Sequence, residues 1–320
     1  IRLEGDFYDS QSIDLLLNVP VPTITGYSTQ MQNIGKVQNR GMEFTLNTKN
    51  LTGEFAWSSN FNISFNKNKV LEVGVDGRPI YGSAANANNA FITKPGYPIA
   101  SFYGYKYIGV FQSEEELAKY PHLSGDKVGD GRYEDVNKDG VLDQNDKTIL
   151  GDNNPLFTAG FSNSFSYKNF TLDIQFTGSY GAEVFSFYKR MCGIYHGDRN
   201  GMIEQLGRWQ SKDQPGDGIH FRPTRTPSGW QRDPSSAWVQ DASYLRLRNL
   251  TLGYNFDQKV LDKMKMKGLR LYVTGQNLFT ITNYVGYDPE TSSESGLAQG
   301  GDYLGYPAAR SFIIGANITF

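Results

Sequence analysis

The sequence predicts an all-β protein of the transmembrane antiparallel β-barrel class, and three observations carry this prediction. Strand-length segments alternate apolar with polar side chains, aromatic residues are abundant (20 Tyr, 20 Phe and 4 Trp), and short turns alternate with long polar segments. Outer-membrane barrels combine these features because each strand turns one face to lipid and the other to a wet lumen, with aromatic girdles at the two interfaces.

Composition narrows the class further. Hydrophobic residues make up 38% of the chain, the mean hydropathy is −0.49, and no apolar run approaches the ~18 residues of a membrane helix. A helical membrane protein is therefore excluded, whereas a barrel is not, because half of each barrel strand faces water. The net charge of −2 indicates neither a nucleic acid nor an anionic membrane surface as partner. Cys192 is the only cysteine, which excludes an internal disulfide.

Two β-hairpins are predicted from alternation on either side of a turn. In residues 43–66, apolar and polar side chains alternate before and after a turn at 51–54. Residues 161–177 repeat the arrangement around a turn at 168–170. A period of two with turn residues between the runs is typical of a hairpin that has one apolar face.

Three long strands are predicted near the C-terminus. Residues 244–256 and 269–280 form two of them, and the segment between has room for a short helical turn. In the first, the alternation slips between Leu247 and Leu250, which predicts a β-bulge. The closing strand, residues 311–320, is long enough to cross a bilayer, which takes ~9–11 tilted residues. Its apolar face carries Phe312, Ile314, Ala316, Ile318 and Phe320.

Long polar segments separate the strands, at residues 75–100, 112–152 and 207–241. Loops beyond ~12–15 residues argue against such an assignment in a compact soluble domain, but outer-membrane barrels carry long loops on one side. We therefore expect these segments to form the extracellular rim. Ser113 and Glu116 make an S-x-x-E capping box, which predicts a short helix inside the second segment.

The most specific chemical motif is DVNKDGVLDQND, residues 135–146. It fills every position of a twelve-residue calcium loop, with Gly140 at the sharp turn. The expected Ca²⁺ ligands are Asp135, Asn137, Asp139, Val141 through its carbonyl, Asp143 and Asp146. Position 12 is Asp rather than Glu and reaches less far, so the loop must draw closer, as in the dockerin-like variant that this spacing resembles. Because no amphipathic helix of useful length flanks the loop on both sides, we expect a structural calcium ion rather than a helix-opening switch. The alternative is an acidic, Asn-rich turn without metal.

Catalytic constellations are thin in the sequence: carboxylates are common enough to leave a glycosidase pair open, but nothing singles out two of them. His122, His196 and His220 are scattered in loops, and neither a metal-binding histidine pair nor a nucleophile motif is present. We therefore expect no enzyme activity. Four loop aromatics are candidates for stacking on a sugar or peptide ligand, with packing of their own loops as the alternative. They are Tyr195, Trp209, Trp230 and Trp238.

Six segments, taken together and in order, carry a family resemblance. They are NIGKVQNRGMEF (33–44), SFYGYKYIGVFQSEEE (101–116), the calcium-loop motif followed by ILGDNNP (135–155), DASYLRLRNLTLGYNF (241–256), GQNLFTITNYVGYDPE (275–290) and the closing strand. The chain resembles, over nearly its whole length, the SusC/RagA-type TonB-dependent transporters of Bacteroidetes outer membranes. The resemblance implies a 22-stranded barrel, of which residues 1–320 look like the C-terminal part.

The resemblance also implies parts that this chain lacks. The plug domain, the TonB box and the N-terminal strands of the family are absent, and the chain starts at Ile1 without a signal peptide, so we expect a fragment. An open sheet edge would leave backbone groups unpaired in lipid. The missing strands are therefore expected to close the barrel.

Active import of an oligosaccharide or an oligopeptide is the function that the resemblance implies. The implied partners are a SusD-like surface lipoprotein acting as a lid, TonB acting through the absent N-terminal part, and outer-membrane lipid, with two SusC–SusD pairs forming a dimer. Two other classes remain open. One is a surface-displayed β-rich glycan-binding module with a structural calcium loop, and the other is a barrel enzyme, for which no nucleophile is found.

Overall fold

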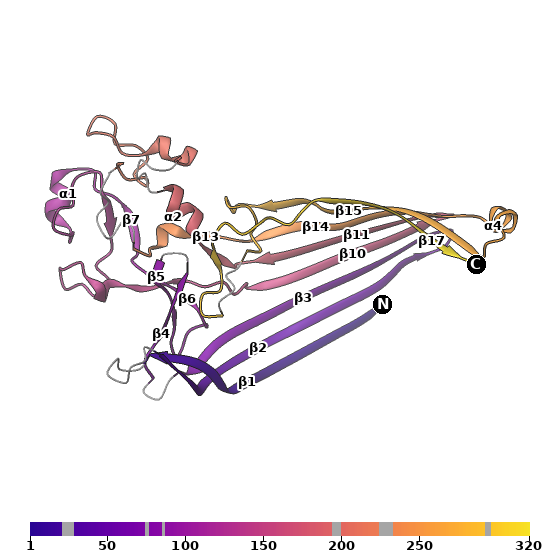
Figure 1. Ribbon diagram of the computed structural model, residues 1–320, viewed down its shortest axis with the longest axis horizontal. Coiled ribbons are helices and arrows are strands. Elements are labelled where there is room, and N and C mark those ends of the chain that lie inside the picture. Colours follow the sequence, from indigo (N-terminus) through magenta and orange to yellow (C-terminus); the bar gives the residue numbers. More distant parts are fainter. Residues whose placement is uncertain (21–28, 74–76, 85–86, 194–199, 224–232, 292–295) are drawn as a thin grey trace.

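The computed structural model is built around one antiparallel sheet of eight long strands (Figure 1). It describes residues 1–20, 29–73, 77–84, 87–193, 200–223, 233–291 and 296–320. Strand order in the sheet follows the order along the chain. The strands are β1 (Arg2–Pro20), β2 (Thr29–Thr52), β3 (Phe55–Glu72), β10 (Phe157–Tyr167), β11 (Phe170–Tyr180), β14 (Tyr244–Asn255), β15 (Gly268–Thr282) and β17 (Ser311–Thr319). The predicted all-β antiparallel class is confirmed.

Short turns join the strands at one end of the sheet, and long connections join them at the other. Residues 53–54 and 168–169 form two of the turns, and helix α4 (Gln258–Met264) lies in the third. Both chain termini lie toward this end, whereas the small strands and the helices other than α4 gather at the opposite end (Figure 1). The one-sided arrangement predicted from the sequence is therefore present, including the helical turn between the last two long strands.

One face of the sheet is apolar. Phe61 pairs with Phe161 across β3 and β10, and Val273 pairs with Ile314 across β15 and β17. Ile314 is 84% exposed, which suits contact with lipid rather than with water. Aromatic rings contact one another near the short turns and again toward the long connections. The first group is Phe55, Trp57, Phe165, Phe170 and Tyr254, and the second is Phe65, Phe157 and Tyr180.

The opposite face of the sheet carries hydrogen-bonded polar side chains. Asn60 Nδ2 donates to Asn47 Oδ1 across β3 and β2 (2.7 Å), and Asn249 Nδ2 donates to Gln175 Oε1 across β14 and β11 (2.7 Å). Such cross-strand pairs stabilise the sheet and keep amide groups satisfied. The alternation seen in the sequence thus separates a lipid-compatible face from a water-compatible one.

The described residues of the long connections fold into a structured unit at one end of the sheet, which we call the loop body. They are residues 73, 77–84, 87–156, 181–193, 200–223, 233–243, 283–291 and 296–310. Its strands are β4 (Ile80–Ala84), β5 (Ala87–Thr93), β6 (Ser101–Gly104), β7 (Tyr107–Val110), β8 (Gly131–Tyr133), β9 (Thr148–Gly151), β12 (Glu183–Ser186), β13 (Val239–Asp241) and β16 (Gly301–Asp302). Its helical segments are α1 (Glu114–Lys119), η2 (Gln144–Asp146), α2 (Phe187–Gly193), η3 (Ile203–Gly207) and η4 (Ser236–Trp238). The segments that the sequence predicts as loops therefore contain short regular elements.

The loop body has a hydrophobic core drawn from all three connections. Phe91 and Phe102 come from the first, Phe185 and Trp238 from the second, and Ala298 from the third. The ring of Phe185 lies 5.9 Å from those of Phe91 and Phe102. Because burying a large apolar side chain contributes about 1.5–3 kcal/mol, this core holds together segments that are distant in sequence.

Helix α1 bears out the predicted N-terminal signal. Ser113 Oγ accepts a hydrogen bond from the Glu116 N–H (3.2 Å). The Glu116 carboxylate accepts one from the Gln112 N–H (2.9 Å), so it reaches one residue further back than the capping box predicts. None of the helices in the described ranges is long and apolar enough to cross a membrane.

Candidate functional site

Residues 135–146, the predicted calcium loop, form a compact turn within the first long connection. Asp135 Oδ1 accepts a hydrogen bond from the Lys138 N–H (2.7 Å), and its Oδ2 accepts one from the Gly140 N–H (2.8 Å). Gly140 has φ of +84°, a conformation that glycine adopts without steric cost. The motif therefore predicts the sharp turn at its sixth position correctly.

Asp146 closes the far end of this loop. Its two carboxylate oxygens accept hydrogen bonds from the Val136 N–H (2.9 Å) and the Asp143 N–H (2.8 Å), and the residue is fully buried. Leu142 anchors the loop by packing against Tyr105 in a small core. The two ends of the segment are thus tied to each other and to the loop body.

The donor set of the loop is made of hard oxygens, which suits Ca²⁺. Asp139 Oδ1 accepts from the Val141 N–H (2.8 Å), and its Oδ2 accepts from Asn137 Nδ2 (2.9 Å). Since a carboxylate oxygen has two lone pairs, one hydrogen bond to each leaves a lone pair for a cation. Within the described ranges, no group of three or more His, Cys, Asp and Glu side chains is already gathered as a metal site.

Two of the four aromatic candidates lie in the described part of the chain, whereas Tyr195 and Trp230 lie outside it. Trp238 is 3% exposed in the core of the loop body, and its Nε1 donates to the Asp233 carbonyl (3.3 Å). Trp209 packs against the same core. Both rings therefore contribute to packing of the loops, which is the alternative that the sequence left open.

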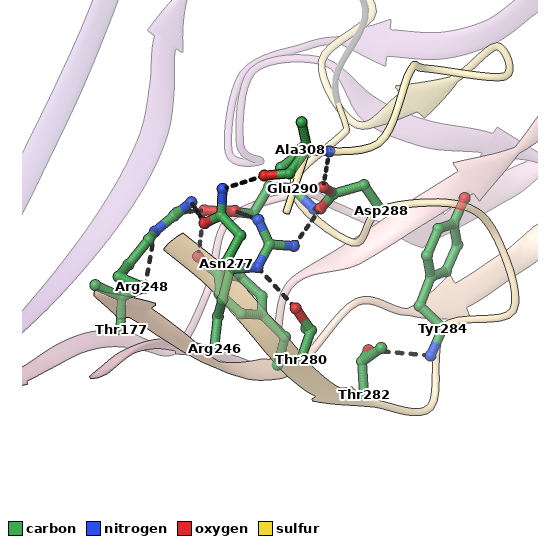
Figure 2. Close-up of polar contacts among 12 residues, drawn as sticks. Thr177, Arg246, Arg248, Asn277, Thr280, Thr282, Tyr284, Asp288, Glu290 and Ala308 are labelled. Carbon is green, nitrogen blue, oxygen red and sulfur yellow. Dashed lines mark hydrogen bonds and ion pairs between the residues drawn. The ribbon is translucent and has the colours of Figure 1, made fainter. Parts of the chain in front are cut away.

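A charged cluster joins the last long connection to the polar face of the sheet (Figure 2). Arg246 Nη2 donates to Asp288 Oδ1 (2.7 Å), its Nε donates to Thr280 Oγ1 (2.8 Å), and its Nη1 bonds Glu290. Arg248 bonds the other oxygen of Glu290. Only 4% of the Arg246 side chain is exposed. The cluster therefore pins residues 288–290 against the wall of the sheet.

The bulge in β14 explains why two arginines meet this connection. The register of β14 shifts between Leu247 and Asn249, as the break in alternation predicts. A bulge adds one residue to a strand, and here Arg248 bonds Thr177 on the polar face, the face that also receives Arg246 and Asn249. The bulge thus concentrates positive charge at one place on the wall.

Asp288 is held in its ionised form by these contacts. Burial acts to raise its pKa, but hydrogen bonds from Arg246 and from the N–H groups of Ala308 and Glu290 hold the pKa below its ordinary value. The sequence analysis did not single out Asp288 or Glu290. The available signal was two arginines beside a break in alternation, followed by a D-x-E segment after the next strand.

The fold and these features define the class of protein. The sheet has long antiparallel strands with one apolar and one polar face. Short turns join these strands at one end and long structured connections join them at the other, which is the architecture of an outer-membrane β-barrel. The strands described here form one wall of such a barrel.

Comparison with known proteins gives the family. No family model matches the chain. The chain is 36% identical over 332 residues to the TonB-dependent receptor P3 of Formosa agariphila, covering 100% of this chain and 32% of the relative. It is 29% identical over 332 residues to the TonB-dependent receptor SusC of Bacteroides thetaiotaomicron, covering 100% of this chain and 30% of the relative. A solved structure of the RagAB peptide transporter superposes with a TM-score of 0.80 at 22% identity, covering 99% of this chain and 33% of that chain.

The chain belongs to the SusC/RagA-type TonB-dependent receptors of outer membranes. It spans about a third of the length of the curated relatives that it matches. The predicted family and the predicted outer-membrane location are confirmed. The likeness to RagAB, at 22% identity, shows the fold alone. These similar proteins are named as receptors and transporters rather than enzymes.

Proposed function

We propose that the protein takes part in TonB-dependent import of a nutrient across the outer membrane. The observation that carries this proposal is similarity to TonB-dependent receptors along the whole chain. The polar face of the sheet supports it, because a polar solute needs a wall of amides and hydroxyls along its path. A hollow of about 460 Å³ lies on this face, lined in part by Asn47, Asn60, Ser162 and Ser164.

The cargo that we propose is an oligosaccharide or an oligopeptide, and the partner is a SusD-like surface lipoprotein that covers the loop body as a lid. The similar RagAB structure is named a peptide transporter, which favours a peptide, whereas the relative SusC leaves the glycan open. The loop body supports a lid because its own core preforms a surface beyond the strands. TonB would act through the plug and N-terminal strands, to which we assign the rest of the relatives' length.

Calcium is a separate proposal for residues 135–146. We infer that Ca²⁺ binds between Asp135 and Asp146, with further oxygens from Asn137, Asp139, Val141 and Asp143. The support is the spacing of the motif, the turn at Gly140 and the lone pairs left on its carboxylates. The ion would stiffen the first long connection, and it takes no part in a reaction.

Uptake by living cells tests the import proposal. The gene for the full-length receptor is deleted, and uptake of labelled oligosaccharide and oligopeptide mixtures is measured with and without TonB. We expect one of the two mixtures to enter wild-type cells and to be excluded after either deletion. Uptake that survives both deletions would overturn the proposal. Surface binding without any uptake would favour the alternative, a glycan-binding module.

A further inference from the structure

Three basic side chains, Arg40, Lys67 and Lys69, lie on the apolar face of the sheet, and we call them the basic row. Residues two apart on a strand share a face, so Arg40 shares the face of Met42 on β2, and the two lysines share the face of Phe65 on β3. Arg40 pairs with Lys67 across the two strands, and Met42 pairs with Phe65. All three basic side chains are exposed. The basic row therefore turns positive charge toward the side of the sheet that meets lipid.

The basic row lies at the depth of lipid headgroups. Phe65 belongs to the aromatic group toward the long connections, and aromatic girdles mark the interface between the membrane core and water. Strand β3 runs from the short turns toward the loop body (Figure 1). Because a strand rises about 3.3 Å per residue, Lys67 lies ~7 Å beyond Phe65 and Lys69 lies ~13 Å beyond it. The two lysines thus stand just outside the apolar layer, where lipid phosphates lie.

A hollow of about 560 Å³ joins the basic row to the apolar face. Its lining has an apolar half, made of Phe7, Met42, Phe65 and Leu156, and a basic half, made of Arg40, Lys67 and Lys69. Gly96 and Pro98 of the first long connection also line it. A hollow with these two halves suits a molecule that has both an acyl chain and an anionic headgroup.

Positive charge exceeds negative charge at this hollow. Arg40 donates from Nη2 and Nε to Asp9 Oδ2 (2.5 and 3.0 Å). Asp152 is the one carboxylate that lines the hollow itself, and its Oδ1 accepts hydrogen bonds from the backbone N–H and Nδ2 of Asn154 (both 2.8 Å). Within the described ranges, neither lysine of the basic row forms an ion pair. Two ammonium groups therefore remain for an anion from outside the chain.

Strands beyond those described here do not cover this face. β2 lies between β1 and β3 in the sheet. The other edge of β3 is paired next to the basic row, where the Val70 N–H donates to the Tyr97 carbonyl (2.8 Å). Further strands of a barrel extend the sheet past β1 and do not lie over its outer face. Since the family is one of outer-membrane receptors, lipid is what meets the outer face here.

We propose that Arg40, Lys67 and Lys69 bind the phosphate group of a membrane lipid, whose acyl chain lies in the apolar half of the hollow. Arginine and lysine donate charge-assisted hydrogen bonds to phosphate oxygens, and basic side chains beside a membrane attract anionic lipids. A second copy of this chain is disfavoured, because two basic rows would face each other. The inference depends on the outer-membrane location and on neither the cargo nor the lid.

Lipid titration of the full-length receptor in detergent, followed by native mass spectrometry, tests this site. The probes are dioleoyl phosphatidic acid, dioleoylglycerol, which has the chains without the phosphate, and glycerol phosphate, which has the phosphate without the chains. We expect the wild type to retain phosphatidic acid in preference to both other probes. The double variant Lys67→Gln/Lys69→Gln should bind phosphatidic acid about tenfold or more weakly, because one lysine near lipid headgroups contributes about fivefold. The control is Lys259→Gln/Lys263→Gln on α4, which removes the same charge at the other end of the sheet and should bind as the wild type does.

Four outcomes would overturn the lipid site. Equal retention of dioleoylglycerol would remove the phosphate from the proposal, and displacement of phosphatidic acid by an equal concentration of glycerol phosphate would remove the acyl chain. Unchanged affinity in Lys67→Gln/Lys69→Gln, or equal weakening in the α4 control, would show that the basic row is not the binding site. Loss of a copurifying acidic protein from the double variant, with lipid binding unchanged, would assign this surface to a protein instead. Migration of unheated samples on SDS gels verifies that every variant has a folded barrel.

Discussion

The hydrogen bonds around Asp288 keep its carboxyl group ionised, so the charged cluster should lose stability when this group is protonated at low pH. Its pKa in the folded chain lies below the ordinary value of 3.8. The stabilisation that its ionisation provides is therefore complete above about pH 4 and is lost as the pH falls through the lower folded value. We expect the thermal midpoint of the full-length receptor in detergent to decrease as the pH is lowered below about 4. Asp288→Asn should flatten this fall, and the same pH profile in both proteins would contradict the assignment.

The calcium loop gives a second prediction for individual residues. Asp135→Ala and Asp139→Ala each remove an expected oxygen ligand, so metal content should drop and protease should cut residues 135–146 faster. Chelation should have the same effect on the wild type and little further effect on the variants. Asn145→Ala, which removes no expected ligand, serves as the control. Calcium content equal to wild type in both Asp variants would disprove the proposed site.

At this scale the sequence predicts local chemistry better than distant contacts. The motif at residues 135–146 predicts the turn at Gly140, because a twelve-residue loop contains its own partners. Arg246 and Asp288, by contrast, are 42 positions apart. Their pairing depends on how β14 and the last connection meet in space, and no local pattern encodes that meeting.

Among the elements, β2 depends on a close approach at Gly41. A Cβ atom there would lie 2.3 Å from the Phe65 carbonyl oxygen and 2.4 Å from the Tyr8 hydroxyl. Gly41→Ala should therefore force β1 and β3 away from β2 and cost about 1–3 kcal/mol, measured as a lower thermal midpoint. Gly53→Ala is the matched control, because a Cβ atom at Gly53 meets nothing within 4 Å. Equal destabilisation by the two changes would contradict the close approach.

The strands that the sequence predicted share a strong period of two. The two hairpins, the helical turn and the bulge are all confirmed, since one apolar face gives a clear alternation. The strands that it missed have weaker signals. β1 and the first part of β2 carry polar residues on both faces over much of their length. The strands of the loop body, such as β8 (Gly131–Tyr133), are too short to show a period.

At the scale of the whole molecule, the sheet follows from the sequence and the loop body does not. Strand order in the sheet repeats chain order, so neighbouring segments suffice to predict the pairings. The core of the loop body instead unites Phe91, Phe185 and Ala298 from three separate connections. The long segments gave no sign of this packing, because their apolar residues follow no regular period. The core of the loop body thus depends on tertiary contacts, and an experiment can measure whether the three connections unfold together.

Trp238 tests that cooperativity. Its side chain is 3% exposed in the shared core, so Trp238→Ala should leave a cavity and cost about 3–5 kcal/mol. If the connections form one unit, amide exchange should accelerate together in β5, β6 and β12, while β10 and β11 keep their protection because they lie outside this core. Tyr306→Ala, at a residue that is 98% exposed, should change neither the stability nor the amide exchange of these strands. Faster exchange confined to the residues next to position 238 would show that the connections fold separately, and the preformed surface that we propose for a partner would lose its foundation.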